Sequence, residues 1–250
     1  MPLKRSDKTR VFEKALSILD LAPGSEWRVL DFGCGNGEFL GYLSQLVGKS
    51  SELIGIDAME NSIVQAKRDY PSIEFICDKF TDRLSFLNAS FDIVATIDTI
   101  ECIRDKDALI NEIHRVLKPR GKVLAMHWDW DTQVYNSEHK EIIRRFVVAY
   151  SDWQQGWMDT ADGQMGRKLW GLFQGSGMFD GRVEVFSLIE TEYRQGKYGH
   201  DRLRDLASLI GKGTIDKSDY DLILSEMEEL QKNRRYFYSV NSYLYCGTSA

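Results

Sequence analysis

Residues 29–40, with the sequence VLDFGCGNGEFL, decide the fold of this chain. An apolar run leads into three glycines at alternate positions, Gly33, Gly35 and Gly37, and an apolar pattern at helical spacing follows them. This order predicts a strand, a tight turn and a helix. Glycine accepts a positive φ at little cost and lets a ligand approach the bare backbone. The turn would also aim the unpaired N–H groups of a helix start at a ligand above it.

The glycine spacing argues against a dinucleotide site. Such sites use the pattern G-x-G-x-x-G, in which the last glycine admits the pyrophosphate. Here the third glycine comes one residue early, and Glu38 stands where that pattern needs glycine. A carboxylate at this point would repel a pyrophosphate. A glycine-rich turn that binds no ligand is the alternative to a cofactor site.

Composition limits the classes of function. A chain of 250 residues can form one large domain or two small ones, and 43% hydrophobic residues suffice for a full core. The net charge of −6 argues against a non-specific nucleic-acid binder, which usually carries a basic face. No apolar stretch has the length of a membrane span, and no apolar run follows Met1, so we expect neither a membrane partner nor a signal peptide.

Cysteine and histidine usage bears on metals and redox setting. Cys34, Cys77, Cys102 and Cys246 are far apart and form no C-x-x-C pair. With only four histidines, the chain shows no zinc pattern, and we expect no metal. Widely spaced thiols fit a reduced, cytoplasmic setting.

An acid ends the second predicted strand. Residues 53–57 are apolar up to Asp57, which lies twenty residues after Gly37. An acid at this position can accept hydrogen bonds from ribose hydroxyls. The alternative is a helix N-cap, because a helical pattern follows from Ile63 to Lys67.

Strand and helix patterns keep alternating along the chain. Residues 73–78 form a third predicted strand that also ends in an acid, residues 91–97 a fourth and residues 123–126 a fifth. A helical pattern at 108–117 precedes the fifth strand, and the Lys-Pro-Arg-Gly sequence at 118–121 forms the turn between them. Uninterrupted alternation predicts an α/β fold, a parallel sheet with helices on both faces.

Residues 27–127 resemble the core of the class I S-adenosylmethionine-dependent methyltransferases, in the small-molecule branch that includes the ubiquinone and menaquinone C-methyltransferases. The resemblance rests on D-x-G-x-G-x-G at 31–37, the acids ending strands two and three, Phe-Asp-x-Val at 91–94, and the helix and proline-glycine turn before strand five. These features are specific to the superfamily and not to a substrate. The resemblance implies S-adenosylmethionine as cofactor and a Rossmann-like, doubly wound sheet of seven strands, mostly parallel with an antiparallel last strand.

The resemblance also implies which residues contact the cofactor. Gly33 and Gly35 would admit its methionine part, with Asp31 near the ammonium group. Asp57 would bind the ribose. Asp78 would meet the adenine amino group, unless it is simply an acid in a surface loop. Further residues expected along this pocket are Cys34, Ala58, Cys77, Lys79 and the backbone of Ile97.

The segment after the fourth strand departs from the family pattern. Many relatives carry a Glu-His pair there, whereas this chain has Glu101 followed by Cys102. Histidine chemistry can therefore not be transferred to that position. The chain also lacks the Asn/Asp-Pro-Pro-aromatic motif of exocyclic-amine methyltransferases and the Pro-Cys pair of the cytosine-C5 type.

A Trp-Asp-Trp-Asp sequence lies within residues 127–132, directly after the fifth predicted strand. Ligands of parallel α/β sheets bind outside the carboxyl ends of the strands, so we expect this segment near the transferred methyl group. Its acids and tryptophans would suit a cationic or amine-bearing substrate, unless the tryptophans pack against lid helices. Asp129 and His127 are the candidates for a catalytic base. The candidate substrate contacts are Trp128, Asp131, Tyr198 and His200.

The second half predicts two more strands, at 182–191 and 242–246, with helices at 138–150 and 167–177 before them. Two amphipathic helices within about 200–236 would form an insertion between strands six and seven. Such an insertion is expected either to cover the substrate as a lid or to form a homodimer contact.

These patterns predict a single domain. It would consist of an N-terminal helix within residues 1–26, a cofactor-binding core at 27–127 and a substrate-side half at 128–250. We expect residues 1–9 to be loose and basic, and the first helix to run from Arg10 to Leu21.

The predicted function is methyl transfer from S-adenosylmethionine to an N or O atom of a small-molecule acceptor. In-line positioning of two reactants can contribute roughly 7–11 kcal/mol to such a reaction. Three rivals are a nucleotide-linked oxidoreductase that binds NAD, a regulatory or sensor protein that binds the cofactor without turnover, and an RNA methyltransferase, which would need a basic face.

Overall fold

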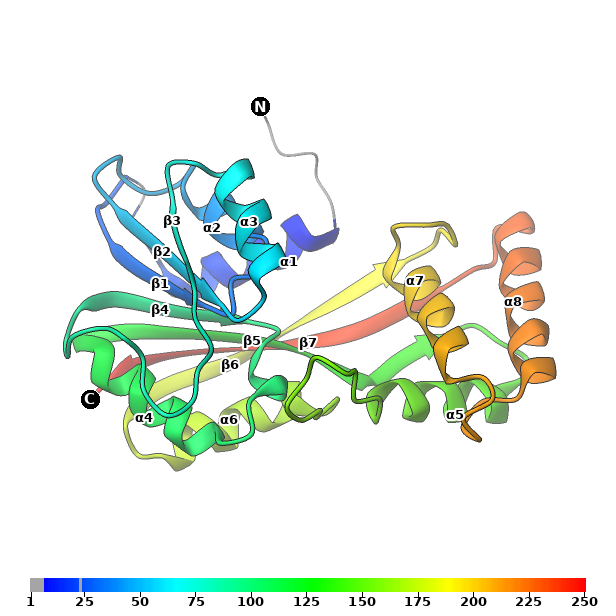
Figure 1. The fold of residues 1–250 in the computed structure, drawn as a ribbon. Coiled ribbons are helices and arrows are strands. Elements are labelled where there is room, and N and C mark those ends of the chain that lie inside the picture. The colour runs from blue at the N-terminus through cyan, green and yellow to red at the C-terminus, as the bar shows by residue number, and fades with distance from the viewer. Residues whose placement is uncertain (1–6, 23) are drawn as a thin grey trace.

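The computed structural model describes residues 7–22 and 24–250 (Figure 1). Helix α1 (Asp7–Leu19) begins three residues earlier than Arg10, so residues 7–9 are helical and not loose as predicted. The rest of the loose segment predicted at 1–9, residues 1–6, lies outside the described residues. Within the described part, no helix combines the length and apolar character that crossing a bilayer requires.

A seven-stranded sheet organises the described residues, in the order β3-β2-β1-β4-β5-β7-β6. Neighbouring strands are parallel except where β7 pairs antiparallel with β5 and with β6. The predicted fold, a mostly parallel sheet with an antiparallel last strand, is confirmed. The strands are β1 (Arg28–Phe32), β2 (Glu52–Asp57), β3 (Glu74–Cys77), β4 (Phe91–Ile97), β5 (Leu117–Tyr135), β6 (Phe179–Glu190) and β7 (Tyr238–Ser249).

Helices cover both faces of the sheet (Figure 1). On one face, α1, α2 (Glu38–Leu43) and α3 (Glu60–Asp69) enclose one apolar cluster. On the other, α4 (Lys106–Val116) and α6 (Met165–Gly175) enclose a second cluster. Burial of apolar side chains on both sides explains why the central strands are continuous apolar runs instead of alternating ones.

Strand β5 is much longer than predicted. It continues through Tyr135 because it stays paired with β7, with Trp128 opposite Ser242 and Asp129 opposite Asn241. The predicted strand at 123–126 ended too early, and the Trp-Asp-Trp-Asp sequence is strand, not a segment that follows it. Side chains of a strand alternate between its faces, so the tryptophans and the acids point to opposite sides of the sheet.

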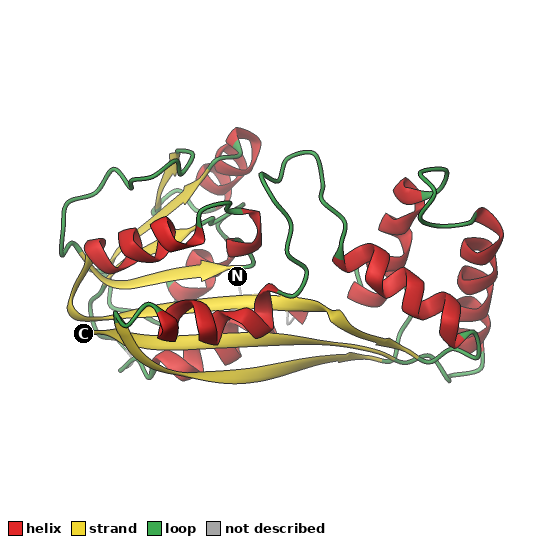
Figure 2. Cartoon of the chain, turned by 90° about the horizontal axis from the view of Figure 1, so that it is seen from below, coloured by secondary structure: helices red, strands yellow, loops and turns green. Residues whose placement is uncertain are grey.

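The remaining helices gather at the far end of the long strands (Figures 1 and 2). They are α5 (Lys140–Ser151), α7 (Tyr198–Asp205), which runs into a short 3-10 helix (Leu206–Leu209), and α8 (Lys217–Lys232). The insertion predicted between strands six and seven is confirmed, and its first helix begins at Tyr198. A second 3-10 helix (Ile100–Cys102) follows β4.

Candidate functional site

The glycine turn between β1 and α2 has a left-handed backbone. Gly33, Gly35 and Gly37 have φ values of 75°, 52° and 79°. A Cβ added to Gly33 would lie 2.2 Å from the side chain of Thr99, which comes from the end of β4. The N–H of Gly33 donates to the carbonyl of Ile56 at 2.8 Å, so the turn is fixed between β4 and β2. Only glycine fits this position without moving its neighbours.

Asp57, at the end of β2, holds the turn from the other side. Its Oδ2 accepts a hydrogen bond from the Gly35 N–H at 2.9 Å, and its Oδ1 accepts one from the Met59 N–H at 2.8 Å. The residue that caps α3 is Met59, so Asp57 precedes the cap instead of forming it. The carboxylate therefore lies over the turn and keeps lone pairs for a ligand.

The turn and the ends of β1, β2, β3 and β4 enclose a cavity of about 560 Å³, which we call the first cavity. Of the residues predicted to bind the cofactor, all except Cys77 line it. Cys77 is exposed, and its Sγ lies 3.9 Å from the carbonyl of Ala58, a residue that does line the cavity. The predicted lining residues are Asp31, Gly33, Cys34, Gly35, Asp57, Ala58, Asp78, Lys79 and Ile97.

Asp31 is the buried acid of the first cavity. Only 1% of its surface is exposed, and its Oδ1 has no hydrogen-bond partner among the described residues. Burial, together with the nearby charge of Asp57, raises the pKa of Asp31 from 3.8 to about 8. A buried carboxylate without a partner is costly, and a bound cation would compensate it. The first cavity therefore suits a ligand that brings a positive charge to Asp31.

A second cavity of about 310 Å³ adjoins the first, and both are lined by Asp98 and Trp157. Asp98 follows β4 directly and has a φ of 58°, in the left-handed region that few residues other than glycine adopt. The remaining walls of the second cavity come from the 3-10 helix after β4, the end of β5, α5, the loop after α5 and α7. They are Glu101, Trp130, Tyr150, Ser151, Trp153, Gln155, Met158, Ala161, Arg202 and Asp205.

An acidic cluster lies beside the second cavity. One oxygen of Asp98, one of Glu101 and one ring nitrogen of His127 lie within 4.8 Å of one another. Burial, with the charges of Asp98 and Asp162, raises the pKa of Glu101 from 4.5 to about 9, so Glu101 holds a proton at neutral pH. Three such donors could also contact a divalent cation. The absence of a metal stays a prediction.

His127 does not line either cavity. It is fully buried, and its Nδ1 lies 2.9 Å from the carbonyl oxygen of Trp128. A carbonyl oxygen only accepts, so Nδ1 carries a hydrogen, and Nε2 has no hydrogen-bond partner among the described residues. The prediction of His127 as a base in contact with the substrate does not agree with this position.

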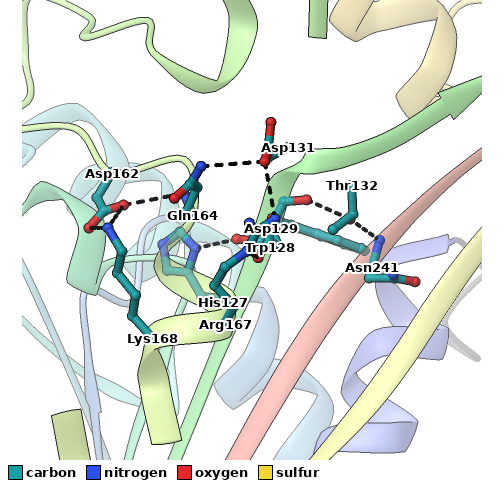
Figure 3. Close-up of polar contacts among 10 residues, drawn as sticks. All are labelled: His127, Trp128, Asp129, Asp131, Thr132, Asp162, Gln164, Arg167, Lys168 and Asn241. Carbon is teal, nitrogen blue, oxygen red and sulfur yellow. Dashed lines mark hydrogen bonds and ion pairs between the residues drawn. The ribbon is translucent and has the colours of Figure 1, made fainter. Parts of the chain in front are cut away.

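Asp129 and Asp131 also lie outside both cavities. Figure 3 shows Arg167 of α6 meeting both acids. The Asp129 carboxylate is fully buried and accepts hydrogen bonds from Arg167 Nε at 2.5 Å and Nη2 at 2.6 Å. Asp131 accepts one from Arg167 Nη2 at 3.3 Å. The predicted roles of base and substrate ligand are therefore corrected to an ion-pair network on the α6 face of the sheet.

The tryptophans of the same sequence are on the cavity side. Trp128, a predicted substrate contact, lines the first cavity, and Trp130 lines the second. Tyr198, another predicted substrate contact, lines the first cavity, and its ring lies 5.0 Å from that of Trp128. His200 lies outside both cavities, and its Nδ1 lies 2.8 Å from Oδ1 of Asp201. The prediction for His200 is not supported by its position.

Sequence reasoning did not single out Asp98 and Arg202, two candidate functional residues that line the second cavity. Asp98 had a signal, because acids that directly follow parallel strands lie at the ligand-binding edge. Arg202 had none, because it belongs to the insertion and is 104 positions away from Asp98.

Comparisons with known proteins agree with this geometry. The model of a methyltransferase domain matches residues 29–121, the region of the glycine turn and of both strand-end acids. An uncharacterised 37.1 kDa protein in transposon Tn4556 of Streptomyces fradiae is 30% identical over 172 residues, which are 67% of this chain and 47% of that protein. The demethylmenaquinone methyltransferase of Staphylococcus epidermidis is 28% identical, covering 72% of this chain and 79% of the enzyme.

The fold is also found among solved structures. The crystal structure of a candidate methyltransferase from Bacillus halodurans superimposes with a TM-score of 0.62 at 15% identity, covering 95% of this chain and 97% of that one. At this identity the likeness shows a shared fold. The chain spans about half the length of the first curated relatives that it matches.

Proposed function

Because this chain belongs to the class I S-adenosylmethionine-dependent methyltransferases, we propose that it transfers the methyl group of S-adenosylmethionine to an N or O atom of a small molecule. The observation that carries the proposal is the buried Asp31 carboxyl group beside the glycine turn, whose Oδ1 has no hydrogen-bond partner among the described residues. When bound, the cofactor supplies a methyl group that its positive sulfur makes electrophilic.

The residues of the first cavity fit the parts of this cofactor. Asp31 faces the cavity with an unpaired oxygen, which an ammonium group would satisfy. Asp57 keeps acceptor capacity for ribose hydroxyls, and Asp78 is available to the adenine amino group. Gly35 leaves the backbone open to close approach, because an added Cβ there would meet no atom within 4 Å. The chain's own residues thus bind and orient the cofactor.

We place the acceptor at the junction of the two cavities, where Asp98 borders both. The Asp98 Oδ1 has no hydrogen-bond partner among the described residues and lies 3.5 Å from His127 Nδ1. In this position its carboxylate can take the proton of an acceptor N–H or O–H while the nitrogen or oxygen bonds to the methyl carbon and the carbon–sulfur bond breaks. Asp98 replaces Asp129 and His127 as the candidate base.

The test is calorimetric titration of the protein with S-adenosylhomocysteine, with NADH in parallel, followed by a screen of amine and phenol acceptors for methyl transfer. Binding of S-adenosylhomocysteine alone, with turnover of an acceptor, supports the proposal. Binding of NADH alone overturns it. Binding without turnover of any acceptor would favour a regulatory or sensor protein, and turnover on RNA alone would favour the RNA methyltransferase.

Asp57→Ala is expected to weaken S-adenosylhomocysteine binding by about 2 kcal/mol or more, because it removes charged hydrogen bonds, each worth on the order of 1.5–3 kcal/mol. It also removes the acceptor for the Gly35 N–H. Isothermal titration calorimetry measures the change. Asp69→Ala is the control, since Asp69 lies outside both cavities and pairs with Arg68 on the surface. Unchanged affinity in Asp57→Ala would exclude a ribose role.

Cofactor binding is expected to release a proton at neutral pH. In the ligand-free protein Asp31 has a pKa of about 8 and is largely protonated there. An ammonium group next to it would lower that pKa, so affinity should rise with pH and level off above about 8. By the same linkage, the ligand-free protein should lose stability as the pH rises from about 4 to about 8, because in this range Asp31 is protonated in the folded state and ionised in the unfolded state.

The proton is measured from the binding enthalpy of S-adenosylhomocysteine in phosphate and in Tris, whose ionisation enthalpies differ. The expected slope corresponds to a release approaching one proton, which Asp31→Asn should abolish. Equal enthalpies in the two buffers for the unmodified protein would contradict the assignment of Asp31 to the ammonium group.

A further inference from the structure

Arg202 presents a guanidinium group to the second cavity. Its Cζ lies 5.7 Å from the ring centroid of Trp130 and 5.6 Å from those of Tyr150 and Tyr198. Its side chain is 26% exposed. Three aromatic rings from β5, α5 and α7 thus hold a largely buried cation in one place.

Most of the donors of this guanidinium are unused. Its Nε donates to Asp205 Oδ2 at 3.1 Å. Among the residues that the structure describes, its two terminal nitrogens form no hydrogen bond. Arginine has five N–H donors in a fixed planar fork, and the terminal nitrogens of Arg202 are not fully buried, so they are accessible to a ligand. The cavity is where an acceptor for them would lie.

The charges around the cavity limit what that acceptor can be. Asp98 and Asp205 also line it, and Glu101 stands there as a protonated acid. A ligand group with a single negative charge can pair with Arg202, whereas a phosphate carries nearly two charges and would meet stronger repulsion from the two carboxylates. A planar carboxylate also matches the planar fork of arginine with two parallel hydrogen bonds.

We propose that the second cavity binds a carboxylate of the methyl acceptor through Arg202, so that the acceptor is a small hydroxy- or amino-carboxylic acid whose nucleophilic atom reaches Asp98. This inference rests on the proposed function, because it takes the second cavity as the acceptor site. Asp129 and Asp131, which the sequence predicted to recognise a positive charge on the substrate, lie outside the cavity. The aromatic rings of Trp130 and Tyr150 would pack against the carbon skeleton of the acid.

The test is titration of the protein saturated with S-adenosylhomocysteine, using two matched pairs of probes. They are para-hydroxybenzoate against para-hydroxybenzamide, and β-alanine against β-alaninamide. In at least one pair, the carboxylate is expected to bind roughly tenfold or more tightly than the amide, as one charged hydrogen-bonding contact predicts. para-Hydroxyphenyl phosphate is run beside them to distinguish a phosphate site.

Arg202→Met is expected to abolish the preference for the carboxylate and to leave S-adenosylhomocysteine affinity within about twofold, because Arg202 does not line the first cavity. Arg202→Lys is the second variant in case the methionine variant does not fold. It keeps the charge, loses the planar fork, and should retain only part of the preference. Arg204→Met is the control, since Arg204 lies on the same helix, is 46% exposed and pairs with Glu228.

The outcomes separate this inference from the proposed function. Equal binding of acids and amides, no binding of either acid, tighter binding of the phosphate, or an undiminished preference in the folded Arg202 variants would overturn the carboxylate subsite. Each of these results leaves S-adenosylhomocysteine binding intact. Failure of S-adenosylhomocysteine to bind would instead overturn the proposed function. The same probe titrations are then run without S-adenosylhomocysteine. A carboxylate preference that disappears in Arg202→Met would then support the carboxylate subsite alone.

Discussion

Replacing Arg167 with methionine is expected to lower the free energy of unfolding by about 1–3 kcal/mol, the usual cost of leaving a buried acceptor without its partner. Asp129 has no exposed surface, whereas the Arg167 side chain is 42% exposed. The substitution would therefore leave an uncompensated carboxylate inside the protein. Urea unfolding measures the loss.

Two further variants make this prediction specific. Arg144→Met removes an arginine that pairs with Glu141 on the surface, where the side chains are 70% and 82% exposed, and it should change stability by less than about 0.5 kcal/mol. Asp129→Asn in the Arg167→Met background should recover part of the loss, because it removes the charge. Equal stabilities of the Arg167 and Arg144 variants would show that the buried pair does not stabilise the fold.

Gly33→Ala is expected to cost about 2–5 kcal/mol, from roughly 1–2 kcal/mol for a left-handed alanine and roughly 1–3 kcal/mol for overpacking. The added Cβ would lie 2.2 Å from Thr99 Cγ2 and Oγ1, so the turn or the end of β4 must move. Because both border the first cavity, S-adenosylhomocysteine affinity should fall with the melting temperature. Differential scanning calorimetry and titration calorimetry measure the two losses.

Gly24→Ala is a matched control for this variant. Its φ of 76° is nearly the same as the 75° of Gly33, but an added Cβ would meet nothing within 4 Å. The control therefore carries the backbone strain without the clash and lies outside both cavities. Similar losses in the two variants would mean that contact with Thr99 contributes nothing, and that backbone strain alone explains the need for glycine.

The cofactor half of the fold could be predicted because its signals are local. The three glycines adjoin the strand and helix that they connect. Asp57 is the last residue of β2, and Asp78 directly follows β3. Parallel strands bring their carboxyl ends to one edge of the sheet, so residues next to those ends come together without further information. Cys77 was the exception, because the last residue of an edge strand can point away from the cavity.

The end of β5 could not be located from its own residues. Its extension depends on β7, whose Ser242 and Asn241 lie more than a hundred residues later. The alternation of Trp128, Asp129 and Trp130 is nevertheless the period of a strand with two unlike faces. Interpreted in that way, it would have separated tryptophans at the cavity from acids at α6. Arg202 offered no comparable signal, because its position follows from how the insertion packs on β5 and α5.

An exposed ion pair joins two lining residues of the first cavity, in which Lys79 Nζ lies 3.0 Å from Asp159 Oδ1. The side chains are 62% and 44% exposed, and pairs of this kind contribute at most about 1 kcal/mol, which is roughly a fivefold change in an equilibrium. A pair of this strength adds little to the barrier for release of a ligand. The residence time of a bound nucleoside should therefore be determined by its contacts with Asp31 and Asp57. Exchange of S-adenosylhomocysteine for S-adenosylmethionine should depend little on ionic strength.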